Sequence, residues 1–181
     1  MSAIINACKR GEIQAEVVNV ISNKQDAKGL EIAKKNGLDT LGVNPHSFEN
    51  NEAYEKHILE ILIKENIDIV CLAGYMKILG PTILNRFNGR VINIHPSLLP
   101  SFKGLHAQKQ ALDYGVKFSG CTAHIVTNKL DDGPILLQEV VPVYDSDTED
   151  LLSDRILEKE HIVYPKAISL LVHRILNEEK V

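Results

Sequence analysis

The sequence has few cysteines, no long apolar run and no excess of positive charge. Its three cysteines, Cys8, Cys71 and Cys121, are far apart and form no Cys-x-x-Cys pair, which favours a reducing cytoplasm over a disulfide framework. No apolar run approaches the ~20 residues of a membrane span, and no secretory signal pattern is present. The net charge is −4 with scattered basic residues, so nucleic acid is disfavoured as a partner.

The apolar content is sufficient for one folded unit. The chain has 181 residues and is 44% hydrophobic, which predicts a single domain over residues 1–181. Segments with helical spacing alternate with strand-like segments such as 15–21, 67–73 and 90–95. The segment 67–73 is nearly all apolar, which predicts a strand buried on both faces. This alternation predicts an α/β fold with a mostly parallel sheet and helices on both faces. Ligands of such folds lie beyond the carboxyl ends of the strands, where His95 stands.

Asn93 and His95 end one of the predicted strands. Residues two apart in a strand project to the same side, so the two side chains are expected to lie together. An amide can stabilise a developing oxyanion and an imidazole can move a proton, a combination that suits acyl transfer. A single histidine at a strand end is more often structural, and from spacing alone both interpretations stay open.

Asp131 lies in a segment of turn-forming residues, 130–134, between two predicted strands. A solvated turn is the simpler interpretation of this composition. The alternative is that an aspartate reaches a histidine and holds it charged or oriented.

The remaining candidates are weaker. His106 could merely line a loop and His124 could be a hydrogen-bonded core residue. A metal site formed by His95, His106 and His124 is disfavoured because no spacing resembles a zinc motif, and we expect no metal. Neither Ser97 nor Ser101 stands in Gly-x-Ser-x-Gly, which disfavours a serine nucleophile.

The run VINIHPSLLPSFKG, residues 91–104, resembles the signature of the 10-formyltetrahydrofolate-dependent formyltransferases. Nearly the whole chain shares the likeness, with further motifs in the same order at residues 22–27, 72–79, 130–135 and 160–165. The resemblance implies a Rossmann-like formyltransferase fold. It also implies transfer of a formyl group from 10-formyltetrahydrofolate, a co-substrate, to the amine of phosphoribosylglycinamide in purine biosynthesis.

The resemblance further implies roles for individual residues. His95 corresponds to the general acid or base, Asn93 to the oxyanion-stabilising amide and Asp131 to the carboxylate that partners the histidine. Glu160 and Leu157 correspond to substrate-binding positions. Asn51 stands where the family often has a folate-contacting arginine. The implied folate-binding residues are Asn51, Met76, Lys77, Ile78, Leu79, Asn93, Thr127, Asn128, Lys129, Leu130 and Asp131.

The beginning of the chain departs from the family pattern. Family members begin with a strand and a loop resembling Gly-x-Gly-Ser-Asn, whose backbone N–H groups bind the substrate phosphate. Residues 1–5 align within the helix that follows, so we expect this strand and loop, about a dozen residues, to be missing. The alternative is a fold that begins with a helix.

Three other functions are weighed against phosphoribosylglycinamide formylation. Methionyl-tRNA formyltransferases usually carry an extra C-terminal domain, and formyltetrahydrofolate hydrolases an N-terminal regulatory domain; we expect neither here. A non-catalytic remnant that binds folate is the third. The preferred expectation is a cytoplasmic enzyme acting on small molecules, as a monomer or homodimer, with no nucleic acid or membrane partner.

Overall fold

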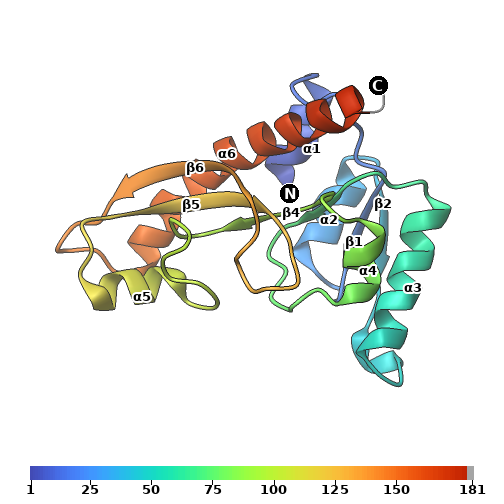
Figure 1. Ribbon diagram of the computed structural model, residues 1–181, viewed down its shortest axis with the longest axis horizontal. Helices are drawn as coiled ribbons and strands as arrows, with labels where there is room; N and C mark the ends of the chain where they lie inside the picture. The colour runs from blue at the N-terminus through green and yellow to red at the C-terminus, as the bar shows by residue number, and fades with distance from the viewer. Residues whose placement is uncertain (179–181) are drawn as a thin grey trace.

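The computed structural model describes residues 1–178, and residues 179–181 of the predicted domain lie outside them. Figure 1 shows the elements in chain order. They are α1 (Ser2–Lys9), β1 (Asn19–Ser22), α2 (Lys28–Lys35), β2 (Asp39–Gly42), the 3-10 helix η1 (Pro45–Ser47), α3 (Asn51–Lys64), β3 (Val70–Leu72), α4 (Pro81–Arg86), β4 (Val91–His95), α5 (Ala107–Tyr114), β5 (Phe118–Ile125), β6 (Ile135–Pro142) and α6 (Glu149–Glu178).

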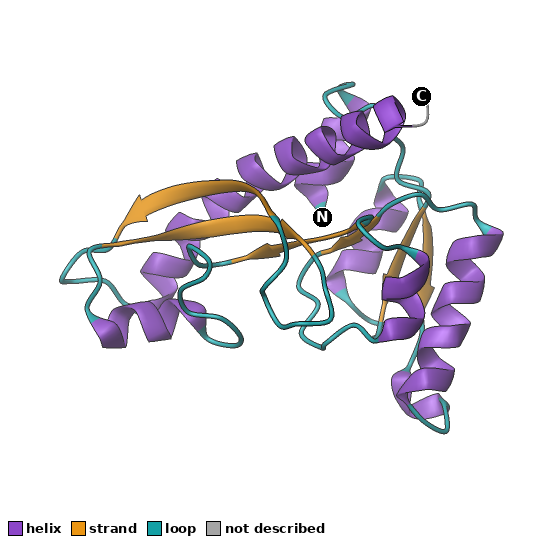
Figure 2. Cartoon of the chain, in the orientation of Figure 1, coloured by secondary structure: helices purple, strands orange, loops and turns teal. Residues whose placement is uncertain are grey.

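The strands form two sheets in the described part of the chain (Figure 2). One is the parallel pair β1 and β2. The other has the order β3-β4-β5-β6, in which β3 and β4 are parallel and the two later pairs are antiparallel. The α/β prediction is confirmed. The pairs β1-β2 and β3-β4 are parallel, as predicted. β5 and β6 run antiparallel because their connection, residues 126–134, contains no crossover helix.

Two predicted strands are shorter in the structure than in the sequence pattern. The segment 15–21 forms a strand only from Asn19, and 67–73 only over Val70–Leu72. The prediction that 67–73 is buried on both faces is wrong, since all three residues of β3 are half-buried. Among the described residues, β1 pairs only with β2 and β3 only with β4. Each is therefore an edge strand, with one side of its backbone unpaired.

Helices cover both faces of the larger sheet, as predicted. Val91 and Ile92 are consecutive in β4 and both fully buried, so their side chains point to opposite faces. Val91 packs in a core with residues of α3 and α4, while Ile92 packs in a second core with residues of α1 and α6. The long helix α6 runs along β5 and β6 (Figure 1). Helix α2 packs on β1 and β2, and α3 and α4 share a core with residues of these two strands. No break occurs at Pro165, which lies inside α6.

One side chain of α6 connects the helix to two strands of the sheet. Tyr164 is 4% exposed, and its hydroxyl oxygen lies 2.6 Å from the carbonyl oxygen of Leu72 and 2.9 Å from that of Ile92. The hydroxyl has one proton, which these two carbonyl groups share. Tyr164 therefore ties β3 and β4 to α6 beneath the end of the sheet.

We expect Tyr164→Phe to lower the free energy of unfolding by ~1–3 kcal/mol, because it leaves buried carbonyl oxygens without their donor. Urea unfolding measures the change. Tyr114→Phe is the matched control, since Tyr114 is 80% exposed, and it should change stability by less than about 0.5 kcal/mol. Equal stability of the two variants would contradict the bridging role of Tyr164.

Candidate active site

β4 and β5 together position a cluster of polar side chains. Alternation along β4 places Asn93 and His95 on one side of the sheet. The antiparallel register then pairs Asn93 with His124 of β5, and directly opposed residues of antiparallel strands have neighbouring side chains. The amide nitrogen of Asn93 lies 3.4 Å from Nε2 of His124.

His95 is 5% exposed, and both nitrogens of its ring face oxygen acceptors. Nδ1 lies 3.4 Å from Oδ2 of Asp131, and Nε2 lies 2.9 Å from the carbonyl oxygen of Phe102. Carboxylate and carbonyl oxygens only accept hydrogen bonds. Each ring nitrogen can therefore form its hydrogen bond only as the donor.

Asp131 is drawn inward rather than solvated. Its side chain is 9% exposed, and Oδ2 accepts a hydrogen bond from the backbone N–H of Gly104 at 2.8 Å. The backbone of Asp131 has a φ of +45°, a left-handed conformation that non-glycine residues adopt uncommonly. The solvated-turn interpretation is wrong for Asp131. It holds better for the adjacent Asp132, which is 41% exposed and forms an ion pair with Lys103.

His124 is 2% exposed and is held in one tautomer. Its Nδ1 lies 3.1 Å from the carbonyl oxygen of Ile125, so Nδ1 carries the proton and donates. Burial, the largest cause, lowers the pKa of His124, which favours the neutral ring at pH 7. Nε2 can then accept a hydrogen bond from the Asn93 amide and orient that amide, and Oδ1 of Asp131 lies 3.8 Å from the same nitrogen. The sequence left His124 as a core residue; its role depends on the β4–β5 register.

The loop that follows β4 is fixed to β5 and β6. Thr122 donates to the carbonyl oxygen of Ser97 at 2.7 Å and accepts from the N–H of Leu99 at 3.0 Å. Gln138 donates to the carbonyl oxygen of Leu99 at 3.0 Å. These contacts hold the first half of the loop against the sheet, and the loop then leads to Phe102, whose carbonyl oxygen faces His95.

Asn51 contacts a buried carboxylate that no sequence pattern indicates. Its amide nitrogen donates to Oε1 of Glu55 at 3.0 Å. Glu55 is 1% exposed and also accepts from the N–H of Gly80 at 2.7 Å. The carboxylate thus ties the start of α3 to the end of the segment 76–79. A glutamate in the first turns of a helix is normally expected to be exposed. The partner that buries Glu55 is 25 residues away in the sequence and leaves no local signal.

The other positions implied to bind folate lie on two loops. Met76 and Ile78 are 77% and 64% exposed, whereas Leu79 is buried. Lys77 places its Nζ 5.9 Å from the centre of the Tyr54 ring. In the second loop Thr127 is half-buried and Asn128, Lys129 and Leu130 are exposed. Large apolar side chains open to solvent on the first loop leave surface for a ligand to cover.

Glu160 and Leu157 are three residues apart on α6 and therefore on one side of the helix. Leu157 is 45% exposed and Glu160 is half-buried. Burial raises the pKa of Glu160 to about 7, and the amino group of Met1 partly opposes this effect. Neither residue is among the side chains that contact Asn93, His95 or Asp131 in residues 1–178.

Metal-binding geometry is not found in residues 1–178, where no cluster of three or more histidine, cysteine or acidic side chains could hold an ion. His106 is 74% exposed and lies 3.8 Å from a carboxylate oxygen of Glu149, apart from His95 and His124. No helix within the same residues is long and apolar enough to span a bilayer.

A buried histidine, a half-buried amide and an inward-facing carboxylate lie together at the end of an α/β strand, and such groups have the chemistry that acyl transfer needs. Comparison with known proteins agrees with this chemistry. The formyl transferase family matches residues 1–168, and the chain belongs to that family.

The similar proteins have names that refer to formyl transfer or purine biosynthesis. The phosphoribosylglycinamide formyltransferase of Escherichia coli (strain K12) is 43% identical over 169 residues, which are 93% of this chain and 80% of that protein. The trifunctional purine biosynthetic protein adenosine-3 of Bos taurus is 44% identical over 170 residues, 94% of this chain but 17% of that protein. The crystal structure of glycinamide ribonucleotide transformylase 1 from Symbiobacterium toebii superposes with a TM-score of 0.93 at 47% identity, covering 94% of this chain and 81% of that one.

We expect Gly133→Ala to displace the loop that carries Asp131. A Cβ at position 133 would lie 1.7 Å from the backbone carbonyl oxygen of Ile125. This clash can be relieved only if the end of β5 or the loop itself moves. The variant should lose ~1–3 kcal/mol of unfolding free energy, the range for overpacking, measured by thermal and urea unfolding. Gly29→Ala is the control, since its Cβ would meet only Met1 at 3.8 Å. A fully stable Gly133→Ala would show that the loop accepts a side chain there.

Stability should fall as the pH rises through the titration of Glu160. The pKa of Glu160 is about 7 in the folded chain, against an ordinary value of 4.5. The folded state therefore keeps the proton at pH values where the unfolded chain loses it, and this contribution to stability falls as the pH rises from 4.5 to about 7. Glu160→Gln should flatten the decline in melting temperature between pH 5 and 8. Glu158→Gln, at an exposed position, serves as control and should keep the wild-type profile. A Glu160→Gln profile that coincides with wild type would contradict the assignment.

Proposed function

We propose that this chain transfers the formyl group of 10-formyltetrahydrofolate to the amine of phosphoribosylglycinamide. The observation that carries the proposal is that His95 faces Asp131, and Asn93 faces His124 beside them, in a chain of the formyl transferase family. The names of the similar proteins support the choice of substrate. We also take residues 1–181 to be one formyltransferase domain, active in the cytoplasm as a monomer or homodimer.

The Asn93 amide acts on the charge that develops in the reaction. The substrate amine attacks the formyl carbon on N10 of the folate, and the carbonyl oxygen becomes an oxyanion in the tetrahedral intermediate. One N–H of Asn93 is directed at His124, which leaves the second N–H to donate to that oxyanion. An amide held in place before the reaction begins stabilises the charge without having to reorient.

His95 manages the protons of the same step. The attacking amine must lose a proton and N10 must gain one when its bond to the formyl carbon breaks. The His95 ring would give one proton to N10 and take up the proton that the amine loses, so that it ends as it began, and the Asp131 carboxylate beside Nδ1 would hold the ring in place. Nε2 is engaged with the Phe102 carbonyl oxygen. This contact must open, or a water molecule must relay the proton, before Nε2 reaches the substrate.

The surrounding loops complete the proposed binding sites. The exposed side chains of Met76 and Ile78, with the loop 127–131, would cover the folate ring, and Asn51 would act through Glu55 on the position of the first loop. Glu160 and Leu157 would meet the ribonucleotide. A carboxyl with a pKa of about 7 can both donate to and accept from sugar hydroxyl groups near neutral pH.

We expect Asn93→Ala and His95→Ala each to lower turnover about a hundredfold or more, the usual effect of losing an oxyanion donor or a general acid–base group. The assay measures formyl transfer as the rate at which tetrahydrofolate is released. Asn85→Ala and His173→Ala, at exposed positions, are matched controls and should retain wild-type rates. Circular dichroism verifies that all four variants are folded. Near-normal turnover of either site variant would overturn the assignment.

The acceptor is tested by the product. Incubation with 10-formyltetrahydrofolate and phosphoribosylglycinamide should yield the formylated ribonucleotide, detected by mass spectrometry. Formate released without the ribonucleotide would instead indicate a hydrolase. Folate binding without any product would indicate a non-catalytic form.

A further inference from the structure

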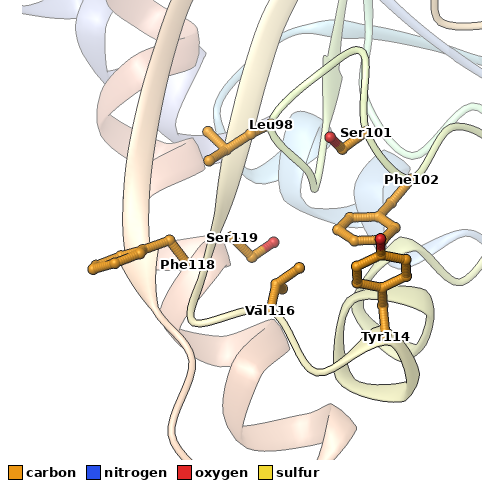
Figure 3. Close-up of a pocket in the computed structure, with 7 residues that line it drawn as sticks. All are labelled: Leu98, Ser101, Phe102, Tyr114, Val116, Phe118 and Ser119. Carbon is orange, nitrogen blue, oxygen red and sulfur yellow. The ribbon is translucent and has the colours of Figure 1, made fainter.

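A pocket of about 360 Å³ lies between the loop after β4, the end of α5 and the start of β5 (Figure 3). Its volume is within the range of small-molecule sites. Phe102 is shared with the cluster around His95: its ring lines the pocket, and its carbonyl oxygen lies 2.9 Å from Nε2 of His95. The proposed folate and ribonucleotide residues do not line this pocket.

Aromatic rings form one wall. Phe102 and Tyr114 meet edge to face, with ring centres 6.0 Å apart and planes inclined at 63°. Tyr114 is 80% exposed, and Phe118 on the opposite rim is 63% exposed. Exposed aromatic side chains beside a recess are typical of ligand sites, because a bound molecule covers surface that water otherwise wets.

Ser119 supplies a polar group without a partner. The residue is 1% exposed, and its hydroxyl has no hydrogen-bond partner among residues 1–178. Figure 3 shows the hydroxyl directed into the pocket. The equally buried Ser97 behaves differently, since its hydroxyl donates to the carbonyl oxygen of Ser101 at 2.5 Å. A buried unpaired hydroxyl is costly, and a ligand that reaches it removes that cost.

We propose that this pocket binds a small uncharged aromatic molecule that carries one hydrogen-bonding group. The ring would pack against Phe102 and Tyr114, and the polar group would bond to the hydroxyl of Ser119. The ligand is uncharged because the residues that line the pocket are apolar, aromatic or hydroxyl-bearing, and an ion would be left without a counter-charge.

A ligand in the pocket would affect His95 through Phe102, which contacts both. A ligand that packs on the ring restrains the residue whose carbonyl oxygen accepts from Nε2. Binding should therefore change the environment of the His95 imidazole, although the ligand does not touch it. The proposal does not depend on the reaction proposed above.

Phenol and toluene are the probes, since they have nearly the same shape and only phenol has a hydroxyl. Titration of the isotope-labelled full chain, followed by NMR, should give saturable binding of phenol in the millimolar range, with shifts at residues 98–102, 114–119 and in the His95 ring. Ser119→Ala should weaken phenol about fivefold, the equivalent of one hydrogen bond of ~1 kcal/mol, and leave toluene within about twofold. Ser146→Ala, at an exposed position, should change neither.

Location and competing occupants are tested in the same series. Val116→Phe, which fills the pocket, should abolish saturable binding of both probes. If that variant fails to fold, the Ser119→Ala comparison still decides. Shifts that stay linear with probe concentration would overturn the proposal, as would equal losses of phenol and toluene in Ser119→Ala. Sedimentation showing a dimer that Tyr114→Ala dissociates would assign the face to a second copy of the chain and would likewise overturn it.

Discussion

The carboxylate of Asp131 accepts a hydrogen bond from Gly104 N–H at 2.8 Å and lies 3.4 Å from Nδ1 of His95. Through these contacts one side chain joins three separate segments of the chain, namely β4, the loop after it and the β5–β6 connection. The ion pair between Lys103 and Asp132 joins the same two loops from the outside. An asparagine at position 131 would keep an acceptor for Gly104 but not the charge opposite His95. The left-handed backbone at Asp131 is maintained because these contacts over-determine it.

The sheet supplies the second half of the site. The register between β4 and β5 sets His124 against Asn93, and the carbonyl oxygen of Ile125 selects the His124 tautomer that accepts. Thr122, in the same strand, holds the loop that ends on Phe102. The groups proposed to be catalytic thus lie on strands and on a loop hydrogen-bonded to them, where position is determined more closely than on free loops. Membership of the formyl transferase family and the geometry of the site are independent observations, and both are consistent with acyl transfer.

Local patterns predicted what depends on neighbours in sequence. Alternation in β4 placed Asn93 and His95 on one side, and turn residues bounded β5 and β6. Pairings between distant residues could not be predicted in this way. The Asn93–His124 contact depends on an antiparallel register, and the burial of Glu55 depends on Gly80 of a different element. The carbonyl oxygen of Phe102 has no sequence signal at all, because every residue has one.

Two predictions failed for the same physical reason. Apolar composition predicted that residues 67–73 form a strand buried on both faces, yet β3 is a short, half-buried edge strand, because burial depends on the strand's neighbours. Asp131 looked like a turn residue because a carboxylate is normally solvated, and its partners in the loop after β4 were invisible locally. The resemblance to formyltransferases supplied the role of Asp131, and the geometry agrees with a partner of His95.

Exchange of the Asp131 carboxylate for an amide isolates the effect of its charge on His95. Formyl transfer by Asp131→Asn should be followed in single turnover with saturating 10-formyltetrahydrofolate and phosphoribosylglycinamide, with folding verified by circular dichroism. Loss of the charge opposite His95 should reduce the rate of the chemical step about a hundredfold or more. A folded Asp131→Asn variant that transfers formyl at the wild-type rate would contradict the account.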